Sequence, residues 1–271
     1  MGAGKHLRPH SETGSVLEAR ILETLRDLSN ATITLNPLVR GGPSHASIIF
    51  AYTADTRNLF RGPLAKKTVV FSPLGIQKEQ LGSPRTPRQT PPKLLYAGRL
   101  LYWKGVYIAI QAFAKLLTKI PAARFTIVGT EPEEARLKAG TLHRKIGITS
   151  ILHRGYRKGN CLNSTIATIS LLFPSLHDSG GFVVLEALCH EVPVVCLDLG
   201  GPNETVTPDS GLIIKTDGRN TTQVASSIAD EVFNVLQSPK TLAQLSSGAY
   251  RGLTILSYQI RMPGLANPLS T

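Results

Sequence analysis

The pattern of apolar and polar positions becomes regular after about residue 93. Short runs that are apolar throughout alternate there with stretches in which apolar residues recur every three or four positions. The first pattern is typical of strands buried in a parallel sheet, and the second of amphipathic helices. The runs predict strands at Leu94–Ala97, Arg124–Val128, Ile151–His153, Ile169–Phe173, Pro193–Leu197 and Leu212–Ile214.

The amphipathic stretches predict helices between these strands and after the last of them. They cover residues 104–118, 133–145, 160–167, 182–190 and 222–236. Strands that are joined by helices form a parallel sheet with helices on both of its faces. We therefore predict an α/β fold, a doubly wound and Rossmann-like parallel sheet, over residues 93–262, followed by a tail at 263–271.

The upstream part of the chain has a less regular pattern. It predicts one amphipathic helix at residues 16–28. Short apolar runs follow at residues 31–38, 47–51 and 68–71. Residues 82–92 read GSPRTPRQTPP, and their prolines and lack of apolar periodicity indicate a linker. Residues 1–81 are accordingly interpreted as a partial N-terminal domain.

The composition is that of a globular protein with an excess of basic residues. The chain has 271 residues, of which 42% are hydrophobic, and a formal charge of +12. No apolar run reaches the roughly 18 residues of a membrane helix, and the N-terminus has no apolar signal core, so a cytoplasmic protein is predicted. Residues 1–104 hold 15 basic and 6 acidic residues, which also suits peripheral contact with an anionic inner membrane face. Because aromatic residues are not interleaved with the basic ones, no nucleic-acid partner is expected.

Several kinds of chemistry are excluded by missing patterns. The three cysteines are an odd number in apolar contexts, so they are interpreted as buried thiols in a reducing compartment. The chain has neither paired aspartates two positions apart nor histidines at zinc spacing, so no metal is expected. The glycine fingerprints of dinucleotide and P-loop sites and the serine-hydrolase elbow are also absent, so no bound cofactor is expected.

Ligands of doubly wound folds bind at the carboxyl ends of the strands, where three loops contain candidate residues. The first loop, residues 98–105, begins with Gly98 and carries Arg99 and Lys104. Two cations at the end of a strand and the start of a helix can converge on one anion. The alternative is two ordinary surface cations beside a glycine turn, and for this pair alone that alternative is favoured.

The second loop, residues 174–187, is the most informative of the three. Gly180 and Gly181 precede a helix, whose unpaired amides and positive dipole end favour a phosphate. Asp178 stands before the glycines, and Glu186 lies one turn into the helix, where it could accept hydrogen bonds from the hydroxyls of a ribose. The alternative is that Asp178 caps the helix and Glu186 stabilises its dipole.

The third loop, residues 198–206, contains Gly200, Gly201 and Pro202. This sequence lets the chain turn closely against a ligand. It is equally an ordinary turn signal, so the loop alone predicts little.

Taken together, the loops resemble a known family. The segments GRLLYWKG, FTIVGTEPEEARL and FPSLHDSGGFVVLEALCHEVPVVCLDLGGPNETV are similar, in order and spacing, to the C-terminal half of the group 1 retaining glycosyltransferases of the GT-B fold. The similarity runs from about residue 93 to 216 and more loosely to 262. The signature of the family is two glutamates separated by seven residues, and here Asp178 and Glu186 stand at those places.

The resemblance also implies roles for single residues. Arg99 and Lys104 would hold the diphosphate of a nucleotide sugar, and Glu186 the ribose hydroxyls. Asp178, with the backbone of Gly180, Gly181 and Phe182, would contact the transferred sugar and its phosphate. The implied donor-binding set is completed by Gly98, Gly129 beside the base, Val183, and Gly201 near the diphosphate.

The implied activity is transfer of a hexosyl-type group from a nucleoside diphosphate sugar to a sugar, lipid or glycan acceptor, with retention and without a metal. Arg99 and Lys104 would stabilise charge on the leaving diphosphate, and Asp178 and Glu186 complete the implied catalytic set. Ser47–Gln80 resembles the last part of the acceptor-side domain that the fold also requires. The alternative is therefore a truncated nucleotide-sugar-binding domain that is catalytically weak or inactive.

Overall fold

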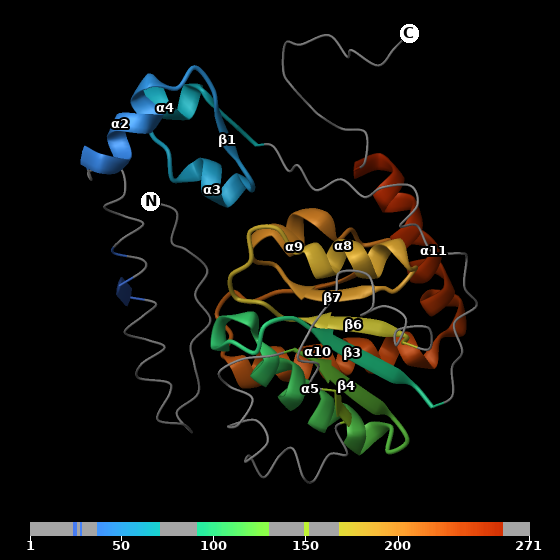
Figure 1. Cartoon of the computed structure of the whole chain (residues 1–271). Coiled ribbons are helices and arrows are strands. Elements are labelled where there is room, and N and C mark those ends of the chain that lie inside the picture. Colours follow the sequence, from blue (N-terminus) through green and yellow to red (C-terminus); the bar gives the residue numbers. More distant parts are fainter. Residues whose placement is uncertain are drawn as a thin grey trace, which may run out of the picture.

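The computed structural model describes residues 24–25, 28, 37–70, 91–129, 149–151 and 168–256 (Figure 1). Its main feature is a six-stranded parallel sheet in the order β5-β4-β3-β6-β7-β8. From β3 the chain moves outward to β5 and then returns to the other side of β3 with β6. This reversal confirms the doubly wound topology. The strands are β3 (Lys93–Ala97), β4 (Arg124–Val128), β5 (Thr149–Ile151), β6 (Ser170–Phe173), β7 (Val194–Leu197) and β8 (Gly211–Ile214).

Helices cover both faces of this sheet, as the alternation of strands and helices predicted (Figure 1). On one face lie α5 (Val106–Lys119) and α10 (Thr221–Gln237). On the other lie α8 (Phe182–Cys189) and α11 (Pro239–Leu256). Side chains of successive strand residues point to opposite faces, so strands that are apolar throughout can be buried on both sides.

The predicted elements agree closely with those found. The strands β3, β4, β6, β7 and β8 and the helices α8 and α10 lie within one residue of the predicted bounds. The strand predicted at Ile151–His153 shares Ile151 with β5, which already includes Thr149, and the last two predicted residues lie outside the described part of the chain. The helix predicted from Lys104 begins later, because Tyr102–Lys104 form a 3-10 turn and Gly105 takes a left-handed conformation, with φ of +70°, before α5.

Other predictions lie outside the described residues. These are the helices at 133–145 and 160–167, the tail at 263–271, and most of the first helix and of the linker. Within the first predicted helix, Thr24, Leu25 and Leu28 are helical.

Helix α11 was missed by the sequence analysis. Its N-terminus has a recognisable signal, since Pro239 is its first residue and the Ser238 hydroxyl accepts a hydrogen bond from the amide of Thr241 at 3.3 Å. Leu242, Leu245 and Ala249 are buried and share one face. The short helix α9 (Gly200–Thr205) likewise replaces what was interpreted as a turn.

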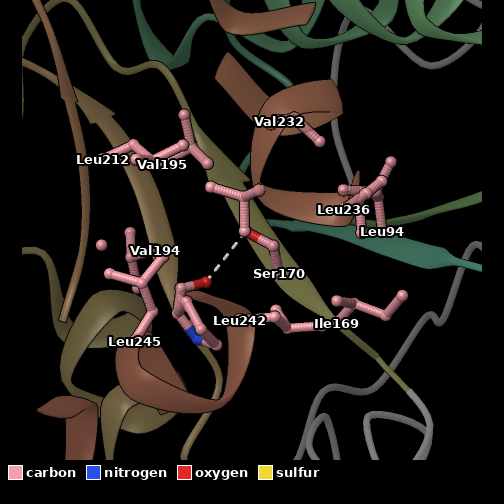
Figure 2. Close-up of a pocket in the computed structure, with 13 residues that line it drawn as sticks. Leu94, Ile169, Ser170, Val194, Val195, Leu212, Val232, Leu236, Leu242 and Leu245 are labelled. Carbon is pink, nitrogen blue, oxygen red and sulfur yellow. Dashed lines mark hydrogen bonds between the residues drawn. The ribbon is translucent and has the colours of Figure 1, made fainter. Parts of the chain in front are cut away.

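A small apolar pocket lies between the sheet and the helices α10 and α11 (Figure 2). It is lined by residues at the amino ends of strands, such as Leu94, Ile169 and Val194, and by Leu242 and Leu245 of α11. The space among these side chains is hardly larger than a water molecule. We regard it as a packing gap, at the end of the sheet opposite the predicted ligand site.

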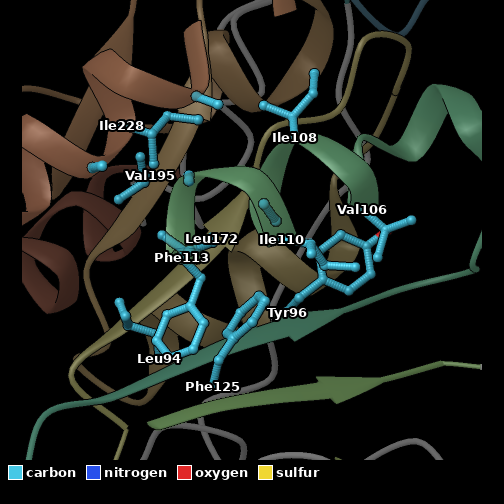
Figure 3. Close-up of a cluster of buried hydrophobic side chains, with 14 of the residues drawn as sticks. Leu94, Tyr96, Val106, Ile108, Ile110, Phe113, Phe125, Leu172, Val195 and Ile228 are labelled. Atoms are coloured by element: carbon cyan, nitrogen blue, oxygen red, sulfur yellow. The ribbon is translucent and has the colours of Figure 1, made fainter. Parts of the chain in front are cut away.

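The hydrophobic core on the α5 side contains large aromatic side chains (Figure 3). Phe113 of α5 and Phe125 of β4 are fully buried, with ring centroids 4.9 Å apart. Tyr96, Leu172 and Val195 extend this cluster across the sheet. Burial of this much apolar surface holds the carboxyl ends of the strands in fixed positions.

The upstream part forms a smaller unit with a two-stranded parallel sheet. The predicted apolar runs at 47–51 and 68–71 become its paired strands β1 and β2. The amide of Ala54 donates a hydrogen bond of 2.8 Å to Glu204 of α9, which joins the two units. The elements of the unit are α2 (Pro37–His45), β1 (Ile49–Ala51), α3 (Ala54–Asn58), α4 (Pro63–Lys66) and β2 (Thr68–Val70).

Candidate functional site

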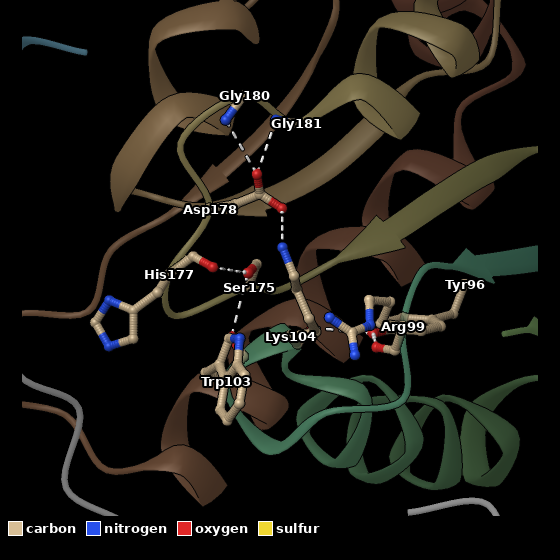
Figure 4. Close-up of polar contacts among 9 residues, drawn as sticks. All are labelled: Tyr96, Arg99, Trp103, Lys104, Ser175, His177, Asp178, Gly180 and Gly181. Atoms are coloured by element: carbon tan, nitrogen blue, oxygen red, sulfur yellow. Dashed lines mark hydrogen bonds and ion pairs between the residues drawn. The ribbon is translucent and has the colours of Figure 1, made fainter. Parts of the chain in front are cut away.

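The first two loops meet at the carboxyl edge of the sheet, where β3 and β6 lie side by side. The ammonium group of Lys104 is 2.5 Å from Oδ2 of Asp178 (Figure 4). The exposed fractions of the two side chains are 21% and 12%, so the pair is only partly open to solvent. Two candidate residues 74 positions apart in the sequence are thus brought into direct contact at the topological switch point of the fold.

The second oxygen of Asp178 binds the turn that precedes α8. Oδ1 accepts hydrogen bonds from the amides of Gly180, at 3.1 Å, and of Gly181, at 2.8 Å (Figure 4). Asp178 therefore fixes the turn that leads into α8, whose N-cap residue is Gly181 with no side-chain cap, so the helix cap that the sequence suggested is not formed. Three hydrogen-bond donors, two amides and one ammonium, converge on a single anionic group.

The third loop packs against the second. The amide of Gly201 donates to the carbonyl oxygen of Asp178 at 2.8 Å. A Cβ atom at Gly200 would lie 2.6 Å from that oxygen, and one at Gly201 would lie 2.4 Å from the carbonyl oxygen of Ser179. The sequence suggested either close approach to a ligand or an ordinary turn at these glycines, and the groups that their Cβ positions approach belong to the neighbouring loop.

Tyr96 closes the first loop and was missed by the sequence analysis. Its buried hydroxyl lies 3.2 Å from the carbonyl oxygens of both Arg99 and Lys104, and can donate to either (Figure 4). Burial, and secondarily the charge of Asp178, raise the pKa of Tyr96, so the hydroxyl keeps its proton. The available signal was a tyrosine in an otherwise aliphatic strand, because a buried hydroxyl needs a partner.

Ser175 and Gly105 join the first loop to the second, and both were also missed. The hydroxyl of Ser175 lies 3.2 Å from the carbonyl oxygen of Trp103, which also accepts the amide of Leu176 at 2.8 Å. At Gly105, a Cβ atom would lie 1.8 Å from the carbonyl oxygen of Pro174. These contacts hold the backbones of Lys104 and Asp178 in register.

The glycines at the ends of β3 and β4 have a similar packing role. The amide of Gly98 donates to the carbonyl oxygen of Val128 at 3.0 Å. A Cβ atom at Gly129 would lie 2.1 Å from the carbonyl oxygen of Gly98. The segment after Gly129, which the resemblance places beside the base, lies outside the described residues.

The remaining candidates lie around this junction. The side chain of Arg99 is exposed and points toward Lys104 in Figure 4. On α8, Phe182 is exposed, whereas Val183 and Glu186 are half-buried. Burial, and secondarily the charge of Glu186, raise the pKa of Cys189 to about 12.

In the described part of the chain, neither the thiols nor the possible metal ligands form a second reactive centre. Cys189 and Cys196 are free and buried, and burial followed by the charge of Asp198 raises the pKa of Cys196 to about 12. Thiols with such pKa values are poor nucleophiles at neutral pH. Within residues 37–70, 91–129 and 168–256, His, Cys, Asp and Glu side chains nowhere gather in threes as a metal site requires. None of the described helices is both long and apolar enough to cross a membrane.

Comparison with known proteins assigns the chain to a family. A family model described as glycosyl transferases group 1 matches residues 77–251, which include all three loops. The chain belongs to this family. The resemblance seen in the sequence motifs is thereby confirmed.

Two relatives illustrate the similarity. The glycogen synthase of Mycobacterium tuberculosis is 30% identical over 171 residues, which are 62% of this chain and 41% of that protein. The D-inositol 3-phosphate glycosyltransferase of Paenarthrobacter aurescens (strain TC1) is 25% identical over 253 residues, which are 85% of this chain and 59% of that protein. The chain thus spans about two fifths of the first relative and three fifths of the second.

Solved glycosyltransferase structures have the same fold. Anabaena Alr3699/HepE in complex with UDP-glucose superposes with a TM-score of 0.66 at 18% sequence identity, over 85% of this chain and 65% of that one. The likeness shows that the doubly wound sheet is that of GT-B glycosyltransferases.

Proposed function

We propose that this protein transfers a glycosyl group from a nucleoside diphosphate sugar to an acceptor, with retention at the anomeric carbon. The observation that carries the proposal is the convergence of Lys104 and the amides of Gly180 and Gly181 on one anionic group. It lies at the switch point, where doubly wound folds bind nucleotides. Membership of the group 1 family supports the reaction class.

In this proposal the donor diphosphate lies between Lys104 and the N-terminus of α8. The amides of Gly180 and Gly181 already bind a carboxylate, and a phosphate is a ligand of the same charge sign for the same donors. A phosphate that binds there takes these donors over and releases Asp178 toward the hydroxyls of the transferred sugar. Arg99 approaches the diphosphate from the exposed side of its loop.

The same arrangement supplies electrostatic catalysis. As the bond between sugar and phosphate lengthens, the leaving diphosphate gains negative charge. Lys104, Arg99 and the helix N-terminus, fixed beforehand by the loop contacts, stabilise that charge more than they stabilise the intact donor. We assign no nucleophile to Asp178 or Glu186, and we propose a reaction without a metal.

Other parts of the proposal concern the rest of the two substrates. Glu186, on the second turn of α8, is proposed to hold the ribose hydroxyls. The acceptor is a sugar, a lipid or a glycan, and a cytoplasmic enzyme with peripheral contact to an anionic membrane suits the basic N-terminal part.

Binding of nucleotide sugars tests the site. Thermal-shift screening of UDP, ADP and GDP sugars, followed by calorimetry, should find a donor that stabilises the protein. Lys104→Met should weaken its binding about ten-fold or more, since it removes the cation that faces the diphosphate. The exposed Lys240 at the start of α11 provides the matched control, and Lys240→Met should leave affinity unchanged. Equal affinity of the two variants would contradict the site.

Turnover separates the enzyme from its alternative. NMR of the product sugar should show the anomeric configuration of the donor. Binding without transfer or donor hydrolysis would favour a nucleotide-sugar-binding domain that is inactive as a transferase. For the ribose contact, Glu186→Gln should reduce the preference for ribonucleotide over deoxyribonucleotide sugars, and an unchanged preference would refute that role.

A further inference from the structure

Two exposed aromatic side chains border the candidate site from different units of the molecule. Tyr52 follows β1 in the small unit, and Phe182 is the first residue of α8. Their exposed fractions are 38% and 62%. A Cβ atom built at Gly180 would lie 3.5 Å from the ring of Phe182 and 3.7 Å from the ring of Tyr52. Both rings therefore lie over the buried Gly180, whose amide binds Asp178.

The position of Tyr52 is fixed by the residues around it. Ala51 and Thr53 are buried on either side, and Tyr52 points outward between them. The hydroxyl of Thr53 caps α3 by accepting the amide of Thr56 at 3.1 Å. The bond from the amide of Ala54 to Glu204 holds this turn against α9. The buried neighbours and the hydrogen bonds of the turn thus fix the backbone of Tyr52.

Core packing does not explain the exposure of Phe182. Helix α8 is anchored by Val184, Leu185 and Leu188, all of them buried. Phe182 stands on the opposite side, next to the glycine pair, where a polar or small residue would solvate more readily. Exposed aromatic rings beside converging polar groups are typical of ligand sites.

We propose that Tyr52 and Phe182 form a platform that binds a pyranose ring next to the diphosphate. The proposal rests on the proposed function and names the ligand chemistry of this part of the same site. The C–H groups of a pyranose carry partial positive charge, and the faces of aromatic rings are negative. One apolar face of the sugar packs on the rings, and its hydroxyls remain within the polar surroundings of Asp178 and the Tyr52 hydroxyl. The ring belongs either to the transferred sugar or to a sugar acceptor.

Paired titrations test the platform. Affinities are measured by calorimetry for UDP, ADP and GDP, for the glucose conjugate of each, and for maltose in the presence of the tightest nucleotide. Tyr52→Ala and Phe182→Ala should each weaken binding of the sugar-bearing probe by about three- to ten-fold, the range expected for an aromatic contact, and leave the free nucleotide within about two-fold. A loss confined to the conjugates identifies the transferred sugar, and a loss confined to maltose identifies the acceptor.

Two further variants separate the ring from its effect on folding. Tyr52→Phe keeps the ring and should retain most of the affinity, whereas Tyr52→Leu should not. Leu59→Ala removes another half-exposed apolar side chain of the small unit and should change the affinity neither for the conjugates nor for maltose. Circular dichroism confirms that each variant is folded.

The outcomes distinguish the platform from the proposed function. If nucleotides bind but both alanine variants keep wild-type affinity for the conjugates and for maltose, the platform is wrong and the function stands. The platform is also wrong if the wild type gains nothing from any sugar. If no nucleotide binds, the proposed function fails, and the platform, which is defined by its place next to the diphosphate, fails with it.

Discussion

The two parallel sheets of the molecule differ in how their side chains are covered. In the six-stranded sheet, Leu94, Leu95 and Tyr96 of β3 are all buried, because helices lie on both faces. In the two-stranded sheet, Phe50 of β1 is 53% exposed and Val70 of β2 is 37% exposed. Parallel sheets are normally buried on both faces, so within the described residues only the larger sheet behaves as the rule expects.

This difference shows that the two units contribute to the site in different ways. The larger sheet places its loops by means of a packed core, so that Lys104 and Asp178 meet within a rigid frame. The smaller unit places Tyr52 mainly through hydrogen bonds at the turn after β1. Substitutions in the larger sheet should therefore mainly lower stability, whereas substitutions in the smaller unit should mainly lower affinity for the ligand.

The largest contrast is expected between two phenylalanines. Phe113→Ala should destabilise the protein by roughly 3–5 kcal/mol, since it removes a fully buried ring that packs on Phe125. Phe50→Ala should change the free energy of unfolding by about 0.5 kcal/mol or less, because exposed positions contribute little. Urea unfolding followed by tryptophan fluorescence measures both. Equal losses would mean that Phe50 is covered in solution and that the contrast between the sheets is wrong.

A second contrast uses two glycines with positive φ. Gly105→Ala should cost roughly 2–5 kcal/mol, because a left-handed alanine is strained and its Cβ atom would lie 1.8 Å from the carbonyl oxygen of Pro174. Gly62→Ala, in the small unit, has φ of +59° and ψ of −132°, a conformation that favours glycine, but no atom within 4 Å of the added Cβ atom, so it should cost only the backbone strain of about 1–3 kcal/mol. The same urea titrations test this pair. Similar losses of unfolding free energy would show that the loops around Gly105 move readily to accommodate the added Cβ atom.

The elements of the larger sheet could be predicted because apolar runs, helix periodicity and turn signals all agreed there. The edge strand β5 was placed too late, since Thr149 and Ser150 are polar and an edge position tolerates them. Helix α11 was missed because Ser246, Ser247 and Gly248 lower its helix propensity, and packing against α8 compensates. In the small unit, short apolar runs indicated strands but not their exposure, which depends on what covers them.

For the site, the sequence predicted which loops meet but not how they bond. The carboxyl ends of parallel strands share one edge, so the proximity of Lys104 and Asp178 follows from the topology. Whether the carboxylate of Asp178 binds the amides of Gly180 and Gly181 depends on side-chain torsions within the loop. The direction of the Tyr96 hydroxyl depends on the neighbouring backbone in the same way, and no local pattern encodes it.

The helix caps offer a smaller contrast. Asn220 caps α10 by accepting the amide of Gln223 at 2.9 Å, and the side-chain oxygen of Gln223 accepts the amide of Asn220 at 2.9 Å. Asn220→Ala should lower the free energy of unfolding by about 1 kcal/mol, since α10 covers the core. Thr53→Ala removes the cap of α3 and should lower global stability less, while hydrogen exchange in α3 accelerates. An equal global loss would indicate that both units unfold together.

The smallest effect on stability is expected where the two units touch. Glu204→Ala removes the acceptor of the Ala54 amide. Because this bond is exposed, the free energy of unfolding of the larger sheet should fall by about 0.5 kcal/mol or less. The turn after β1 should open more often, so trypsin should cleave faster at the exposed Arg61 of the small unit. Glu231→Ala, at an exposed position on α10, serves as the control for loss of a carboxylate. Cleavage at the same rate in both variants would show that the two units are held together by contacts other than this hydrogen bond.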